Sequence, residues 1–305
     1  MHPDDLVTQD TASTFEVELP GPIDVPASVE IFRRNGDDGI DRWDGANLVR
    51  TVPVNGRLVA YACTTAGSVE RPVLRVKVGD TAHHDAAERA VRATFVLPPA
   101  QFEQLLDADP VVARLNGLFP GVRPVLHHDL LAAIVRCISA QQVNLRWAVT
   151  TRRRLAEAFG QAQMVDGHTV YGLDPERLAA ADPADIRALQ FTNRKAEYLI
   201  AAAQAVASGA LTIASLQGLP DEDVISQLTS LRGIGLWTAE WILARTLGRP
   251  RVVAGDLGVR KAVGLAYLGT PLPSEQEVRS ATTHWGPSAG VAQQLLLHGF
   301  SQGAL

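Results

Sequence analysis

The sequence predicts an α+β protein in which an N-terminal mixed α/β sheet domain, residues 11–98, precedes an all-α body, residues 99–305. Before Pro98, apolar residues alternate over short runs that end at glycine or asparagine, which is typical of strands. After Pro98 they recur at helical spacing, and proline, glycine and aspartate separate the runs. The change of pattern predicts a domain boundary at Pro98–Pro99.

The N-terminal part has the pattern of a small mixed sheet. Residues 1–10 are polar and acidic, and we expect them to be disordered. Val54–Arg57 contains Asn55–Gly56, which predicts a hairpin turn, and a helix is expected near Ala86–Ala93. The predicted strands lie at Phe15–Leu19, Leu48–Val54, Arg57–Ala62 and Val73–Val78.

The second part reads as a series of helices. One is predicted to begin at Asp182–Pro183, because aspartate caps a helix and proline suits its first position. Others are predicted at Asp129–Ser139, Arg146–Phe159 and Ala196–Ala207.

Two further helices meet at a glycine turn. One begins after Pro220–Asp221, and the other runs from Trp237 to Leu247. Gly233 and Gly235 between them permit a tight turn, which would point free N–H groups of the second helix at a ligand such as phosphate. The spacing alone favours an ordinary helical hairpin closed by glycines over a phosphate site.

Composition places few limits on function. The net charge of −5 argues mildly against nucleic acid, but residues 1–50 hold eleven acidic and four basic residues, which leaves +2 on the rest. Two cysteines are too few for a disulfide scaffold or a four-cysteine metal centre, so a reducing cytoplasm is the expected compartment. No apolar run has the roughly 18 residues of a membrane span, so no membrane partner is expected.

Three ordered segments carry a resemblance to a known family. They are Leu231–Ala239 followed by Asp256, then Ile138–Asn144, and Asn193–Tyr198. Together they resemble the helix-hairpin-helix DNA glycosylases, in the branch of 3-methyladenine DNA glycosylase II. The resemblance implies that the helical body has two parts, and that the protein removes alkylated purines from double-stranded DNA as a monomer.

The resemblance assigns the catalytic role to Asp256, which spacing alone would make a turn or cap residue. A carboxylate can stabilise the positive charge that builds on the sugar when an N-glycosidic bond breaks. Trp237 stands where lyase relatives carry a lysine, which implies a glycosylase without strand cleavage.

The resemblance also implies a base pocket of electron-rich rings. It places Trp237 and Trp241 in this pocket, although two tryptophans four residues apart are often core residues. The last aromatic position of the pocket falls near Leu297 in this chain, and Trp285 is a candidate substitute.

The remaining expected roles concern DNA contact. Gln142 falls where the family inserts a wedge, and its alternative role is that of a solvated helix end. The family also implies contacts with the DNA backbone by Gly233, Gly235, Thr238, Arg194 and Lys195. For Arg194 and Lys195, a solvated surface role is at least as open. Backbone carbonyls of Thr229 and Leu231 would hold a monovalent cation, Na⁺ or K⁺. No iron–sulfur cluster is expected, since no cysteine follows Cys137.

Two classes of function remain open. The first is the glycosylase, whose lesion could also be a deaminated purine or a mismatched pyrimidine. The second is a catalytically weak protein that keeps the hairpin for sequence-independent DNA binding. Asp256 and the paired tryptophans favour the enzyme, because gripping a backbone requires neither.

Overall fold

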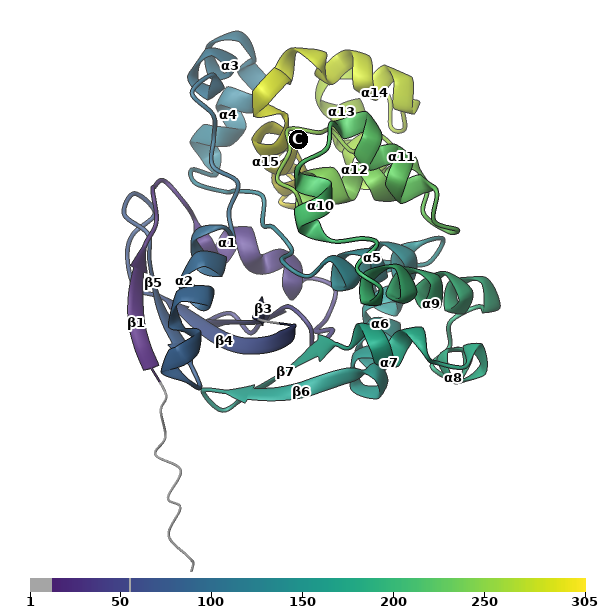
Figure 1. Cartoon of the computed structure of the whole chain (residues 1–305). Coiled ribbons are helices and arrows are strands. Elements are labelled where there is room, and N and C mark those ends of the chain that lie inside the picture. The colour runs from purple at the N-terminus through teal and green to yellow at the C-terminus, as the bar shows by residue number, and fades with distance from the viewer. Residues whose placement is uncertain (1–12, 55) are drawn as a thin grey trace, which may run out of the picture.

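The computed structural model describes residues 13–54 and 56–305. An N-terminal sheet lies beside two groups of helices, and the chain ends within the second group (Figure 1). Residues 1–10, for which disorder is predicted, lie outside the described residues. Asn55 of the predicted turn also lies outside them.

The N-terminal sheet has the strand order β1-β5-β4-β3-β2, and every described pair is antiparallel. The expected α/β domain is therefore present, but its sheet is antiparallel and not mixed. The reason is that short turns join β3 to β4 and β4 to β5, whereas parallel neighbours need a long crossover. The strands are β1 (Ser13–Glu18), β2 (Arg42–Trp43), β3 (Asn47–Val54), β4 (Arg57–Thr65) and β5 (Val73–Val78).

Short helices close one side of this sheet. The predicted helix near Ala86–Ala93 is α2 (His84–Arg92), whose buried Ala87, Ala90 and Val91 join the core. This core also receives α1 (Val25–Val29) and η1 (Glu30–Phe32), while η2 (Thr81–His83) leads into α2.

The helical body consists of two lobes with separate apolar cores. The first lobe contains α5 (Leu130–Ala140), α6 (Leu145–Phe159), α7 (Pro175–Ala179), α8 (Pro183–Ala188), α9 (Asn193–Ala207), α10 (Ile213–Gln217), α11 (Asp221–Thr229) and α12 (Leu236–Arg245). The second contains α3 (Phe102–Ala108), α4 (Pro110–Leu118), α13 (Leu257–Val263), η3 (Gly264–Leu268), α14 (Glu275–Thr282), η4 (Thr283–Ser288) and α15 (Ala289–Ser301). The second lobe thus joins the first helices after the sheet domain to the last helices of the chain.

A two-stranded hairpin inside the first lobe corrects the prediction that the body is all-α. It is formed by β6 (Gly160–Val165) and β7 (His168–Leu173), joined by Asp166–Gly167. Both turn residues have positive φ, as an Asp-Gly hairpin requires. Val165 and Val170 pack against the N-terminal sheet, so the hairpin connects the two domains (Figure 1).

None of the described helices is long and apolar enough to cross a membrane.

Candidate functional site

The glycine turn between α11 and α12 lies directly against α9. Gly233 has φ +90, and a Cβ atom there would lie 2.1 Å from the Tyr198 ring. Only glycine combines this backbone conformation with so close an approach. The predicted helical hairpin is therefore present, and α9 supports its turn.

The N-terminus of α12 is open. Gly235 occupies the cap position with no side-chain hydrogen bond, and a Cβ there would meet nothing within 4 Å in the described chain. Other helices, such as α5 and α13, have an aspartate that accepts from one amide of their first turn. The amides of α12 are thus left for an outside acceptor, and an anion suits them best.

Thr238 does not join this surface. It lies on the inner side of α12 with 1% of its surface exposed. Its hydroxyl is therefore not placed to reach a phosphate, which corrects the predicted contact.

Asp256 lies at the start of the second lobe, where it caps α13. Its Oδ1 accepts from the Val259 amide at 3.0 Å, and the residue is half-buried. Within the described chain no donor meets its Oδ2. One carboxylate oxygen is thus held by the fold while the other remains available.

A buried ion-pair cluster supports the segment that carries Asp256. Glu240 of α12 is fully buried and contacts Arg251 at 3.2 Å and Arg279 at 2.7 Å. The Val253 amide donates to Gln293 of α15 at 2.8 Å. The segment between α12 and α13 is therefore tied to both lobes.

The three tryptophans expected at the base pocket have different surroundings. Trp237 is half-buried. Trp241 packs on the first core and meets the His127 ring with centroids 5.1 Å apart. Trp285 is 1% exposed in the second core, where its N–H donates to Asp109 at 3.2 Å.

Trp285 is thus a core residue, and its proposed substitution into the pocket is wrong. Leu297 of α15 lies close to the Asp256 carboxylate. A Cβ atom added at Gly258 would lie 3.2 Å from Leu297 Cδ2 and 3.1 Å from Asp256 Oδ1. A leucine therefore stands beside Asp256, where the resemblance places an aromatic residue.

The loop between α5 and α6 presents Gln142 to solvent. Gln142 is exposed and has φ +54, a left-handed conformation that is uncommon for residues other than glycine. Its neighbour Gln141 donates from Nε2 to the Gly233 carbonyl at 3.0 Å. The loop and the glycine turn are thus held together, although they are about ninety residues apart in sequence.

Sequence reasoning missed the apolar side chains that continue this loop. Val143, Leu145 and Trp147 are 37%, 54% and 38% exposed, and Arg154 lies 5.5 Å over the Trp147 ring. Alternating apolar residues directly after two glutamines were the available signal.

The two basic residues of the α9 motif have different roles. Arg194 is exposed. Lys195 is half-buried and donates from Nζ to the Ser139 carbonyl at the end of α5, at 2.9 Å. Burial lowers the pKa of Lys195. Lys195 therefore connects α9 to α5 by a hydrogen bond within the protein, whereas Arg194 is free to bind an anion from outside.

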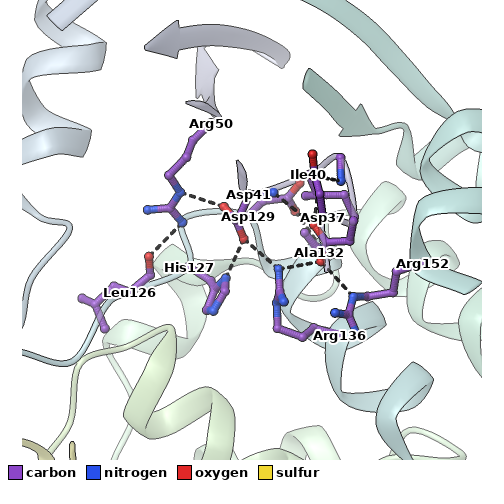
Figure 2. Close-up of polar contacts among 12 residues, drawn as sticks. Asp37, Ile40, Asp41, Arg50, Leu126, His127, Asp129, Ala132, Arg136 and Arg152 are labelled. Atoms are coloured by element: carbon purple, nitrogen blue, oxygen red, sulfur yellow. Dashed lines mark hydrogen bonds and ion pairs between the residues drawn. The ribbon is translucent and has the colours of Figure 1, made fainter. Parts of the chain in front are cut away.

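A buried charge network lies where the N-terminal domain meets α5 and α6 (Figure 2). Asp41 accepts from Arg50 at 2.7 Å, His127 Nδ1 at 2.9 Å and Arg136 at 3.1 Å. Burial alone would raise the pKa of Asp41, but Arg50 and His127 beside it hold this pKa well below its ordinary value.

The network extends to the loop that carries Gln142. Asp38 accepts from Arg152 at 3.0 Å, and Arg152 also donates to the Ser139 hydroxyl at 2.9 Å. Residues of the sheet domain thus help to fix the end of α5. The sequence showed these aspartates only as negative charge, because their partners lie far along the chain.

The fold and the site together define a class of protein. An antiparallel sheet precedes two helical lobes; one carries a helix-hairpin-helix turn with open amides, and the other begins at a carboxylate with one free oxygen. A family model described as "HhH-GPD superfamily base excision DNA repair protein" matches residues 135–288, just over half of the chain. The chain belongs to this HhH-GPD superfamily.

Curated relatives and solved structures agree with this assignment. The putative DNA-3-methyladenine glycosylase YfjP of Bacillus subtilis is 34% identical over 177 residues, which cover 58% of this chain and 61% of the relative. A DNA-3-methyladenine glycosylase of the same organism is 30% identical over 186 residues, with 60% and 61% covered. The chain thus spans about three fifths of the length of these relatives.

The whole fold is similar to that of a solved 3-methyladenine DNA glycosylase from Archaeoglobus fulgidus. The TM-score is 0.83, and the match covers 95% of this chain and 100% of that one at 23% identity. This likeness extends the shared fold to the N-terminal sheet domain.

Proposed function

We propose that this chain is a monofunctional DNA glycosylase of base excision repair. It flips an alkylated purine of the 3-methyladenine type out of double-stranded DNA and hydrolyses its N-glycosidic bond, which leaves an abasic site. We expect it to act as a monomer. The names of the B. subtilis relatives support this substrate class.

The observation that carries the proposal is the free oxygen of Asp256. When the glycosidic bond breaks, its electron pair leaves with the base and positive charge develops on the sugar. The Asp256 carboxylate stabilises that charge and orients a water molecule. The water oxygen bonds to the sugar carbon, and its proton passes to the carboxylate and from there to solvent. The Val259 amide holds the other oxygen, so the carboxylate is preorganised.

Trp237 supports hydrolysis without strand cleavage. Its indole has no amine, so it cannot form the covalent imine with the sugar through which a lysine leads to strand scission. Trp237 and Trp241 offer electron-rich faces that suit a cationic alkylated base. Alkylation of a purine already weakens its glycosidic bond, so such a base needs few specific contacts. This fits a pocket completed by Leu297.

The open end of α12 supports backbone binding. The amides that begin at Gly235 suit a DNA phosphate, and Arg194 adds a charge. The exposed Gln142 is suited to fill the gap left by the flipped base. The carbonyls of Thr229 and Leu231 are the groups that would hold Na⁺ or K⁺, which would bridge the turn to phosphate.

The test is release of free base from methylated duplex DNA by the wild-type protein and by Asp256→Asn. Asparagine can still cap α13 but carries no charge. We expect the single-turnover rate to fall by roughly 10²- to 10³-fold, the loss typical of removing one preorganised electrostatic group. The matched control is Asp182→Asn, because Asp182 also caps a helix, α8, by accepting from a backbone amide of its first turn. Base release by this control should stay at the wild-type rate.

The abasic product should remain uncut until alkali is added. Equal release by wild type and Asp256→Asn would show that another group carries the chemistry. Tight DNA binding with no base release from methylated, deaminated or mismatched duplexes would indicate a binding protein. Base release from a deaminated or mismatched duplex alone would mean that the enzyme acts on that lesion and not on alkylated purines.

A further inference from the structure

A cationic cleft lies between the N-terminal domain and α6, outside the site described above. Its volume is about 460 Å³, and it opens to solvent. Residues 34–37 form one wall, and one face of α6 forms the other. The charged residues of its lining are Arg34, Asp37, Arg146 and Arg153.

The two walls are packed closely at one point. Gly36 has φ +115, and a Cβ atom there would lie 3.1 Å from Val149 Cγ1 of α6. The glycine brings the loop against the helix and places Arg34 and Arg146 on the same cavity. Two arginines that are 112 positions apart in sequence therefore face one volume.

The charges of the cleft do not cancel. Asp37 accepts twice from Arg42, at 2.8 and 2.6 Å, and Arg153 pairs with Glu157 at 3.0 Å. In the described part of the chain, Arg34 and Arg146 have no carboxylate within ion-pair distance. Two positive charges therefore remain for an outside anion, although the N-terminal domain is acidic as a whole.

The cleft begins near the loop that carries Gln142. Arg146 is four residues after Gln142, so their Cα atoms are at most about 14 Å apart. Arg153 is two helical turns further, about 10 Å along the axis of α6. One strand of DNA rises 3.4 Å per nucleotide, so the cleft lies within about seven base pairs of the flipped base.

We propose that this cleft binds the phosphate backbone of the duplex on one side of the lesion, so that the N-terminal domain takes part in DNA binding. This inference rests on DNA as the substrate of the proposed function. Among the residues that line the cleft there is no aromatic ring, so a free nucleotide would find no surface for its base. A polyanion that continues beyond the cleft fits the open cavity.

The test measures the salt dependence of binding to a duplex with an uncleavable abasic-site analogue, between 50 and 200 mM salt. Arg34→Gln and Arg146→Gln should each reduce the slope of log Kd against log salt by about 0.9, the value for one phosphate contact. The affinity should fall several-fold at the low-salt end. Arg75→Gln is the control, since Arg75 is an exposed arginine of the same domain that pairs with Glu16 on β1.

A second series locates the contact. Duplexes are shortened stepwise from twelve base pairs to one on one side of the lesion and then on the other. On one of these short duplexes the wild type should lose affinity and match both variants, because the contacted phosphates are missing. Differences that persist on both short duplexes would overturn the proposed position.

The proposed DNA contact of the cleft and the proposed glycosylase activity can be refuted independently of each other. If both variants keep the wild-type salt slope while the wild type releases base, the cleft does not bind DNA and the proposed function stands. If no methylated duplex loses its base but the slopes still change, the cleft is supported and the activity is wrong. Equal unfolding midpoints for wild type and variants ensure that binding is compared between folded proteins.

Discussion

Gly233 and Gly235 occupy the same turn for different physical reasons. Gly233 combines a positive φ with direct contact to the Tyr198 ring. Gly235 has an extended backbone that any residue can adopt, and open space where a Cβ atom would lie. Gly233 is therefore required by the fold, whereas Gly235 keeps the amides of α12 accessible.

Alanine at each position separates these roles. Gly233→Ala should lower the free energy of unfolding by about 1–3 kcal/mol for the left-handed backbone, with an overpacking cost of about 1–3 kcal/mol against Tyr198. Gly235→Ala should change it by less than about 1 kcal/mol. Urea unfolding of both variants measures this difference, and equal losses would mean that the contact with Tyr198 relaxes freely.

At the scale of one element, α9 has two adjacent basic residues with unlike surroundings. Arg194 is exposed, whereas Lys195 reaches across to the end of α5. The Ser139 carbonyl that accepts from Lys195 precedes Gln142 by three residues. Lys195 therefore acts on the fold of the loop, and Arg194 is the residue of the pair that can neutralise a phosphate.

Methionine at each position tests the assignment, since it keeps an unbranched side chain and removes the charge. Arg194→Met should reduce the slope of log Kd against log salt by about 0.9 for duplex DNA. Lys195→Met should leave that slope unchanged and lower the free energy of unfolding by about 1–3 kcal/mol, because the Ser139 carbonyl loses a charged donor. A reduced slope for Lys195→Met would instead place this lysine on DNA.

At the scale of the whole molecule, buried titratable groups join the N-terminal domain to the helical body (Figure 2). Burial lowers the pKa of His127 to about 4 and that of His128 to about 3. Burial raises the pKa of Asp129 to about 6. These groups make the free energy of unfolding depend on pH between 4 and 7.

The sign follows from the protons bound in each state. At pH 5 both histidines are neutral in the folded protein but protonated in the unfolded chain, where their pKa is near 6.5. Asp129 acts in the opposite direction, since the folded protein keeps a proton that the unfolded chain has lost. The unfolded chain therefore binds more protons in total, and stability falls as the pH decreases from 7 to 5.

Urea unfolding at pH 7, 6 and 5 measures this dependence. His128→Asn removes one of the two histidines that lower stability at acidic pH and leaves Asp129 in place. The free energy of unfolding of this variant should therefore decrease less over the same pH range. A decrease at least as large as that of the wild type would show that His128 does not contribute as its burial implies.

Local features of the chain were predicted well from sequence. Asp182 caps α8 as expected, and α5 lies where a helix was predicted over Asp129–Ser139, with Asp129 as its cap. α11 begins at Asp221, and α12 follows the glycine turn. The family resemblance and the choice of the 3-methyladenine branch agree with the family match and with the named relatives. The roles of Asp256 and Gln142 remain predictions, although the structure leaves both accessible.

The sequence by itself determined where the helices begin, where the chain turns and which family it belongs to, because caps, turns and periodicity depend on residues within a few positions of each other. Only the tertiary structure decided which side chains remain available. Trp285 is buried in the second core and donates to Asp109, which lies 176 positions away. Arg152 is paired with Asp38, which lies 114 positions away. Burial and ion pairing depend on partners brought together by folding, and no local pattern contains that information.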